Sequence, residues 1–276
     1  YSVPCDGFLS MTFHRGIMFA ELQDVKMYYE DVGEGEPVIL IAGIGANHRF
    51  WKRMVSLLEG YRVITLDNRG AGETEYTGDV EIDIMADDVI HLMDYLGIEK
   101  AHIVGWSMGS QISQSLGLRY ADRLQTVTLV STYPYRPDRT AYFMYMMAKA
   151  AVDGVCSMDQ VNVMFNAFCF PETAFNKLAE EGKIMPIPKH PEDPKEVLKQ
   201  MVSMNNFDTR GRTKDISVPT LVVHGGADIM VEPKLGRYVG NTIPGCRYIE
   251  VDGEGHTIAS DLYIDALKEL LAQHKM

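Results

Sequence analysis

The stretch with the clearest chemical potential surrounds Ser107, in Gly105-Trp106-Ser107-Met108-Gly109. An apolar run precedes it and a helical pattern follows it, which predicts a sharp strand-to-helix turn that presents the serine hydroxyl. Small residues two positions away on either side let the backbone bend without a clash. The alternative is a serine that only occupies a tight turn, but its position between a predicted strand and a predicted helix favours a nucleophile.

A serine hydroxyl needs a base to accept its proton, and histidine is suited because its unperturbed pKa is about 6.5. Among the eight histidines, His256 occupies the glycine-rich loop DGEGHT after the last predicted strand. His224 lies inside an apolar run and is expected to be buried against a helix. We therefore predict His256 as the base, and the alternative for this residue is an ordinary turn or surface histidine.

The imidazole in turn needs a carboxylate that fixes its tautomer and stabilises its positive charge. Asp228 follows the predicted strand TLVVHGG and is the preferred acid. Asp138, which follows the preceding predicted strand, is the alternative acid. The three residues occur along the chain in the order Ser107, Asp228, His256. This order of nucleophile, acid and base is the one expected when the nucleophile lies at such a turn of a parallel sheet.

Two backbone N–H groups are candidates for binding an oxyanion. The loop AGIGANHRFW offers that of Ile44, and the helix after the serine offers that of Met108. The alternative for the first loop is a glycine-rich turn without a catalytic part. The next loop, DNRGAGET, is expected to be structural, because Arg69 can tie neighbouring loops together while Gly70 and Gly72 supply positive φ.

The elements that must position these residues can be read from apolar, β-branched runs that end at turn residues. Strands are predicted at 37–43, 62–67, 101–107, 124–131, 220–228 and 246–253, after a hairpin at 18–31. Helical patterns lie between them, and the clearest one ends at Gly97. This alternation predicts an α/β fold class, with a doubly wound, mostly parallel sheet and ligands beyond the carboxyl ends of its strands.

One interval, residues 132–217, is too long for a structureless connection inside a compact domain. Residues 139–154 and 196–207 have helical patterns, and Met185 to Pro194 is a proline-broken loop. The interval is rich in methionine and aromatic residues, so we interpret it as a helical lid inserted before the penultimate core strand. An apolar lid indicates a partly apolar substrate, although packing between lid and core is the alternative use of these residues.

The predicted organisation therefore has four parts. They are an N-terminal extension at 1–17 that is disordered or a cloning remnant, a first core segment at 18–131, the lid at 132–217 and a second core segment at 218–276. The extension is set aside because it shows no clear helical or strand period.

The composition excludes several kinds of partner. Lys plus Arg number 26 against 38 Asp plus Glu, and the net charge of −12 opposes binding to nucleic acid or anionic lipid. No apolar run approaches the length that spans a bilayer, and no secretory signal is recognisable. The four cysteines contain no CxxC pair, which argues against a metal site and a disulfide framework. We expect a cytoplasmic protein that does not bind membranes, and a homodimer is left open.

The segments AGIG, DNRGAGET, GWSMG, HGGAD and GEGH, in this order and spacing, resemble the α/β-hydrolase superfamily from about Met18 to the C-terminus, outside the lid. Within it the chain resembles small lidded serine carboxylesterases, enol-lactonases and cofactor-free haloperoxidase-like hydrolases. The resemblance implies a catalytic triad of Ser107, Asp228 and His256, with the N–H groups of Ile44 and Met108 as the oxyanion hole.

Two departures from the family pattern, and the identity of the nucleophile, narrow what the resemblance implies. Many members have His where this chain has Ala42, which affects a polar contact under the oxyanion loop but not the backbone donor. Glu73-Thr74 replaces a single residue followed by Ser, a minor departure. Ser107 stands where epoxide hydrolases and haloalkane dehalogenases use Asp, which argues against their chemistry.

Together these features predict a serine hydrolase that cleaves a carboxylic ester or lactone of a small to medium, partly apolar substrate through an acyl-enzyme on Ser107. No metal and no organic cofactor is expected. The alternatives on the same triad are carbon–carbon bond hydrolysis, aminopeptidase-like cleavage and perhydrolysis. A different class is a receptor that binds a small lactone without turning it over.

Overall fold

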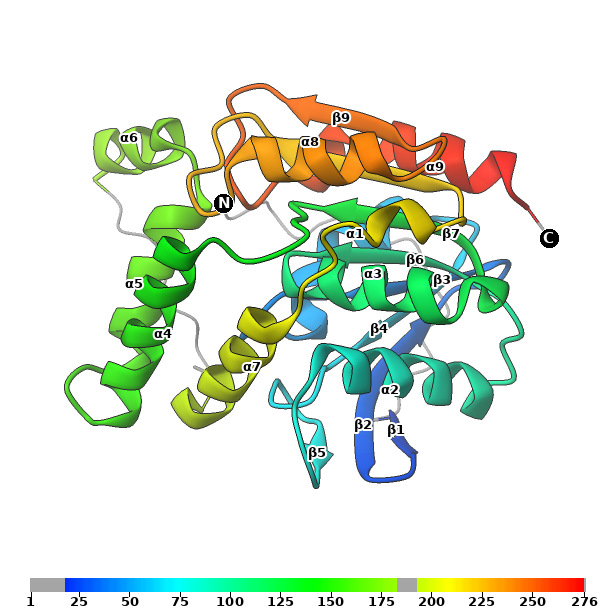
Figure 1. Ribbon diagram of the computed structural model, residues 1–276, viewed down its shortest axis with the longest axis horizontal. Helices are drawn as coiled ribbons and strands as arrows, with labels where there is room; N and C mark the ends of the chain where they lie inside the picture. The colour runs from blue at the N-terminus through cyan, green and yellow to red at the C-terminus, as the bar shows by residue number, and fades with distance from the viewer. Residues whose placement is uncertain (1–17, 183–192, 276) are drawn as a thin grey trace.

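The computed structural model describes residues 18–182 and 193–275, which form a nine-stranded sheet with helices on both faces (Figure 1). The strands are β1 (Met18–Glu21), β2 (Val25–Val32), β3 (Pro37–Ile41), β4 (Arg62–Leu66), β5 (Glu75–Tyr76), β6 (Ala101–Trp106), β7 (Leu124–Val130), β8 (Thr220–Gly225) and β9 (Arg247–Val251). The helices are α1 (Lys52–Leu57), α2 (Ile82–Tyr95), α3 (Met108–Arg119), α4 (Asp138–Val152), α5 (Met158–Cys169), α6 (Glu172–Glu180), α7 (Pro194–Asn206), α8 (Pro233–Thr242) and α9 (Ile264–Gln273).

The order of strands across the sheet is β1-β2-β4-β3-β6-β7-β8-β9, with β5 beside β2. The hairpin of β1 and β2 is antiparallel and joins β4 antiparallel, whereas all pairs from β4 to β9 are parallel. The loops that follow the parallel strands therefore meet at one edge, where ligands bind in such sheets. The predicted strands, the hairpin and the α/β fold class with a doubly wound, mostly parallel sheet are confirmed.

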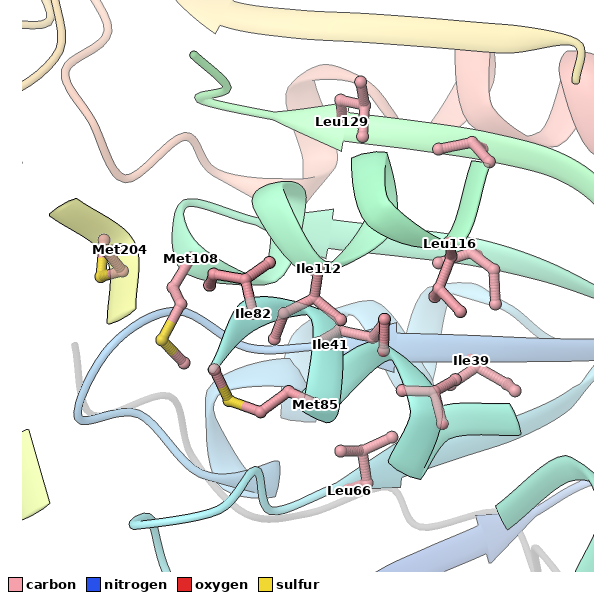
Figure 2. Close-up of a cluster of buried hydrophobic side chains, with 14 of the residues drawn as sticks. Ile39, Ile41, Leu66, Ile82, Met85, Met108, Ile112, Leu116, Leu129 and Met204 are labelled. Carbon is pink, nitrogen blue, oxygen red and sulfur yellow. The ribbon is translucent and has the colours of Figure 1, made fainter. Parts of the chain in front are cut away.

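Alternate strand residues serve two separate cores because both faces of the sheet are covered. In β3, Ile39 and Ile41 pack with residues of α2 and α3, which Figure 2 shows. Val38 and Leu40 point to the opposite face and pack with Trp51 and with residues of α1 and α9. The continuous apolar runs of the strands follow from this two-sided burial.

The helical pattern before Gly97 forms α2. Its apolar residues Met85, Val89 and Leu92 are buried against the sheet. Gly97 follows the helix with a φ of +66°, a conformation that favours glycine at a helix end. The predicted helix and its stop signal are confirmed.

Between β7 and β8 the described residues form four helices, which stand to one side of the sheet in Figure 1. The helices expected at 139–154 and 196–207 are α4 and α7, whereas α5 and α6 are not predicted individually. A capping box at Ser157 and Gln160 begins α5, and this local signal is visible in the sequence. Most of the predicted loop at 185–194 lies outside the described residues.

The predicted extension at 1–17 also lies outside the described residues. In the part of the chain that is described, no helix has both the length and the apolar character needed to cross a membrane. The same part contains no group of three or more His, Cys, Asp or Glu side chains arranged to hold a metal ion.

Candidate active site

Ser107 occupies a sharp turn between β6 and α3. Its φ of 54° and ψ of −115° belong to neither a helix nor a strand. The flanking glycines are required by sterics, because a Cβ at Gly105 would lie 2.2 Å from the carbonyl oxygen of Gly109. A Cβ at Gly109 would lie 2.0 Å from the carbonyl oxygen of Ile41. The predicted strand-to-helix turn is present, and its strain is maintained by close packing of the turn against β3.

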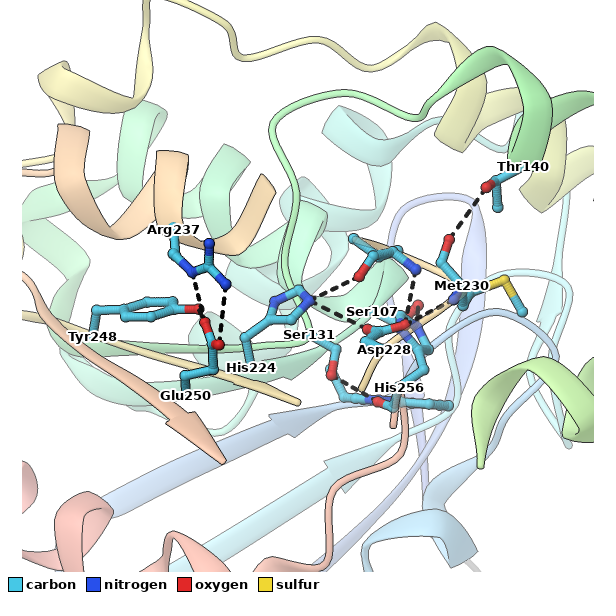
Figure 3. A network of polar contacts seen from close by, with 12 residues as sticks. Ser107, Ser131, Thr140, His224, Asp228, Met230, Arg237, Tyr248, Glu250 and His256 are labelled. Atoms are coloured by element: carbon cyan, nitrogen blue, oxygen red, sulfur yellow. Dashed lines mark hydrogen bonds and ion pairs between the residues drawn. The ribbon is translucent and has the colours of Figure 1, made fainter. Parts of the chain in front are cut away.

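A chain of two hydrogen bonds joins Ser107, His256 and Asp228 (Figure 3). His256 Nε2 lies 2.9 Å from Ser107 Oγ, and His256 Nδ1 lies 2.8 Å from Asp228 Oδ2. With the proton on Nδ1, the ring donates to the carboxylate and accepts from the serine hydroxyl. The structure thus brings together three side chains from the loops after β6, β8 and β9, and all three are buried.

The Asp228 carboxylate is held by the backbone as well as by histidine. Its Oδ1 accepts the N–H groups of Met230 at 2.9 Å and Val231 at 2.8 Å. Burial by itself raises the pKa of Asp228, but the neighbouring His256 and His224 rings hold that pKa well below its ordinary value. The carboxylate is therefore ionised at neutral pH and can stabilise a positive charge on His256.

His224 is buried against α8, as expected, since a Cβ at Gly236 would lie 2.2 Å from its Nδ1. Its Nε2 lies 3.0 Å from the carbonyl oxygen of Val231 and 3.3 Å from Asp228 Oδ2. This second contact of Asp228 is not among the predicted ones. The signal for it is the spacing of four residues across the end of β8, which places both side chains at the same edge of the sheet.

The main chain of His256 is fixed by two side chains. Its carbonyl oxygen accepts the indole N–H of Trp106 at 2.9 Å and the hydroxyl of Ser131 at 2.7 Å. Gly255 has no room for a side chain, because a Cβ there would lie 2.7 Å from the carbonyl oxygen of Cys169. These contacts, from β6, from the residue after β7 and from α5, position the imidazole, and no local pattern in the sequence predicts them.

The alternative acid is placed elsewhere. Asp138 is exposed at the first position of α4, and the described residues give it no contact with His256. Of the two candidate carboxylates, the structure brings only Asp228 to the imidazole.

The two expected oxyanion donors flank the serine. The loop that carries Ile44 runs against the turn, since a Cβ at Gly43 would lie 3.1 Å from the Cβ of Ser107. Met108 is the first residue of α3, where helix N–H groups lack partners within the helix. Ile44 lines the same cavity as Ser107, and Met108 directly follows the serine in the chain.

Polar side chains hold the loop that carries Ala42 and Ile44, the expected oxyanion donor. The Asn68 side-chain amide donates to the carbonyl oxygen of Ala42 at 3.2 Å. The N–H of Gly45 donates to Oε1 of Gln200, a fully buried residue of α7, at 3.0 Å. The loop is thus fixed from the loop after β4 and from the helices between β7 and β8.

The loop after β4 is structural, as predicted. The guanidinium of Arg69 donates to both carboxylate oxygens of Asp88 at 2.6 and 2.8 Å, to Asp24 at 2.9 Å and to the carbonyl of Thr77 at 3.0 Å. The loop also contains two glycines with positive φ, Gly70 at 76° and Gly72 at 56°.

A cavity of about 300 Å³ opens onto Ser107 and His256. Apolar side chains from the loops and from α4 and α5 form most of its wall, including Phe50, Trp106, Met144, Phe165, Phe170 and Met230. Cys169 also lines it, and burial raises the pKa of its thiol to about 12, so it is not a competing nucleophile at neutral pH. Hollows of about 630 and 590 Å³ elsewhere contain neither Ser107 nor His256.

Known proteins are similar to this chain in sequence or in fold. The candidate carbamate hydrolase RutD of Azorhizobium caulinodans is 28% identical over 258 residues, which cover 92% of this chain and 96% of the relative. The candidate non-heme bromoperoxidase BpoC of Mycobacterium tuberculosis is 29% identical over 246 residues, which cover 84% and 91%. The crystal structure of the enol-lactonase from Burkholderia xenovorans superposes with a TM-score of 0.82 at 24% identity, covering 92% of this chain and 100% of that one.

A family profile described as alpha/beta hydrolase fold matches residues 36–261, which is most of the chain. This match agrees with the sheet order and with the resemblance found in the sequence motifs. The chain therefore belongs to the α/β-hydrolase fold family, a superfamily of hydrolytic enzymes.

Proposed function

We propose that the protein is a serine hydrolase that cleaves a carboxylic ester or lactone of a small to medium, partly apolar substrate. The observation that carries this proposal is the hydrogen-bonded chain Ser107–His256–Asp228, with distances of 2.9 and 2.8 Å, at the wall of an apolar cavity. Ser107 is the nucleophile, His256 the general base and Asp228 the residue that orients the imidazole.

In the first half-reaction, His256 Nε2 takes the proton of Ser107 while Oγ forms a bond to the substrate carbonyl carbon. The N–H groups of Ile44 and Met108 stabilise the negative oxygen of the tetrahedral intermediate. Collapse of this intermediate breaks the bond to the alcohol oxygen, which takes the proton from His256. In a lactone this alcohol stays attached to the acyl group.

In the second half-reaction, His256 takes a proton from water, and the hydroxide oxygen attacks the acyl-enzyme carbonyl. The acid leaves as the bond to Ser107 Oγ breaks, and His256 returns the proton to that oxygen. The ionised Asp228 stabilises the imidazolium in both halves. These steps use only side chains, backbone N–H groups and water.

The segment at 132–217 is proposed as a lid domain between core segments at 18–131 and 218–276. Residues of α4 and α5 contribute to the cavity wall, and Gln200 of α7 contacts the loop that carries Ile44. An apolar wall that includes the flexible Met144 supports an apolar portion in the substrate.

The direct test replaces the nucleophile. Ser107→Ala should lower kcat for p-nitrophenyl butyrate by at least about 10³-fold and abolish labelling by a fluorophosphonate probe, with unchanged circular dichroism. Asp228→Asn should cost roughly 10²- to 10⁴-fold, whereas Asp138→Asn serves as the matched control and should leave activity unchanged. Retention of more than a few per cent of activity by Ser107→Ala contradicts the assignment.

A substrate panel separates the proposal from its alternatives. Esters and lactones are compared with a methyl carbamate, a peptide amide and a β-diketone, since the relative RutD is named for carbamate hydrolysis. Sustained turnover of esters or lactones supports the proposal. A single burst followed by covalent retention favours a receptor, and faster cleavage of carbamate, amide or diketone reassigns the bond.

A further inference from the structure

Arg136, in the loop between β7 and α4, is a buried cation without a carboxylate beside it in the described part of the chain. Arg136 is only 7% exposed to solvent. The guanidinium contacts the sulfur atoms of Met201 at 3.3 Å, of Met204 at 3.8 Å and of Met144. Its remaining polar contact is the side-chain oxygen of Asn205 at 3.4 Å. Thioether sulfur is a weak acceptor, so these contacts compensate little of the lost hydration.

Such an environment is unfavourable to the folded chain. Burial lowers the pKa of Arg136, yet an arginine in a protein remains protonated. A buried charge is ordinarily paired, because an uncompensated one costs free energy of folding. A neutral side chain would fill this space at lower cost, so the charge is best explained by an anion that joins it.

The anion would lie in the cavity that contains Ser107. Arg136 and Ser107 both line it, and among its described lining residues Arg136 is the only Lys, Arg, Asp or Glu. Asn162 and Asn166, one turn apart on α5, add amide groups to the same wall. The cavity therefore combines an apolar wall, one fixed cation and the proposed nucleophile.

We infer that Arg136 binds a carboxylate of the substrate, so that the ester or lactone hydrolysed at Ser107 carries a free acid group on a short chain. This inference rests on the proposed function, since it concerns the same cavity. Guanidinium and carboxylate match in geometry and can form two parallel N–H···O bonds. The contact is stronger inside a cavity screened from water than at the surface.

The test compares two esters of the same shape and different charge. They are monomethyl glutarate and the methyl ester of glutaric acid monoamide, and hydrolysis is followed by release of methanol. The protein should prefer the acid by roughly 50-fold or more in kcat/KM. Most of this preference should appear in KM, because the contact is present in both the ground state and the transition state.

Replacement of Arg136 should remove the preference. Arg136→Met and Arg136→Gln should bring the ratio of the two kcat/KM values close to one. Arg136→Lys should retain part of it, since it keeps the charge and loses the planar fork. Arg139→Met, three positions along the chain and exposed on α4, is the matched control and should leave the ratio unchanged.

A binding measurement separates this inference from the proposed function. Glutarate is titrated calorimetrically into Ser107→Ala and into Ser107→Ala/Arg136→Gln, and at least a tenfold weaker binding to the second variant is expected. Hydrolysis of both esters without preference, or glutarate binding that is independent of Arg136, overturns the inference and leaves the proposed function standing. Glutarate binding that depends on Arg136, in a protein that hydrolyses neither these esters nor p-nitrophenyl butyrate, supports the carboxylate site at Arg136 and removes the proposed function.

Discussion

Arg69 and Arg136 are both buried arginines, but their surroundings are opposite. Arg69 is 1% exposed and pairs with the carboxylates of Asp88 in α2 and of Asp24 between β1 and β2. Arg136 is surrounded by methionine sulfur atoms and one amide oxygen at the wall of the cavity. Burial alone lowers the pKa of each guanidinium. The two carboxylates more than reverse this effect for Arg69, whereas Arg136 has no carboxylate beside it among the described residues and its pKa stays lowered.

The difference distinguishes a cation that stabilises the fold, Arg69, from a cation that is available to a ligand, Arg136. The charge of Arg69 is paired with two carboxylates of the same chain. These ion pairs tie the loop after β4 to α2 and to the hairpin of β1 and β2. The guanidinium of Arg136 has no carboxylate partner among the described residues, and Arg136 lines a cavity. A charge that the fold satisfies stabilises the fold, whereas one that the fold leaves unsatisfied is available to a ligand.

The largest effect is expected at Arg69. Arg69→Met should lower the free energy of unfolding by about 3–5 kcal/mol, because it leaves Asp88 charged and buried without its partner. Urea denaturation followed by circular dichroism measures this. Arg53→Met is the control, since the pair of Arg53 with Asp261 is exposed to solvent and its loss should not change the midpoint. Equal stability of Arg69→Met and the parent protein would remove the scaffold role.

The pH dependence of Arg69→Met should identify Asp88 as the cause. Burial raises the pKa of the Asp88 carboxyl above its ordinary 3.8, and the cation that lowers it would be gone. The folded state then binds a proton more readily than the unfolded state, so stability rises as the pH falls from 7 through the folded pKa. Arg69→Met/Asp88→Asn should lose this dependence and regain about 1–2 kcal/mol at pH 7. Parallel pH profiles of the two variants would exclude Asp88.

Arg136→Met should behave in the opposite way to Arg69→Met. The free energy of unfolding should be unchanged or higher by up to about 2 kcal/mol, since an uncompensated cation is replaced by a side chain like its neighbours. Urea denaturation under the same conditions gives the comparison. A loss as large as that of Arg69→Met would show that Arg136 is a scaffold residue whose contacts stabilise the fold.

The sequence predicts well the residues whose positions depend on where strands end, Arg69 among them. Ser107, Asp228 and His256 follow strands that local apolar patterns reveal, so a one-dimensional pattern is sufficient to place them at one edge of the sheet. The structural role of Arg69 is likewise predicted from its glycine-rich loop. These residues depend on where strands end, which is a local property of the chain.

The surroundings of Arg136 depend on packing between segments that are distant in the sequence. The isolation of Arg136 becomes visible only when Met144 of α4 and Met201 and Met204 of α7 are placed around it. The sequence predicts α4 and α7 but not that they contact one another. The same holds for the hydrogen bond from Gly45 to Gln200, which joins residues 155 positions apart.

Gln200 connects the two regions and gives the smallest predicted effect. Its side-chain N–H donates to the carbonyl of Arg69 at 2.7 Å while its Oε1 accepts the N–H of Gly45, next to the proposed oxyanion donor Ile44. Gln200→Met fills the space but leaves both backbone groups without this partner. Unfolding should become easier by about 1 kcal/mol. kcat should fall severalfold with little change in KM, because the donor is less well positioned in the transition state.

The matched control for Gln200 is Gln273→Met, at the exposed end of α9, which should change neither the urea midpoint nor kcat. A fall in stability without a fall in kcat would mean that the loop carrying Ile44 keeps its geometry without the contact from Gln200. The fold and the proposed reaction would then be independent of each other at this position. A fall in both means that the helices between β7 and β8 do more than close the cavity. They then couple the loop held by Arg69 to the proposed oxyanion donor Ile44, and the two regions contrasted above act on the same reaction.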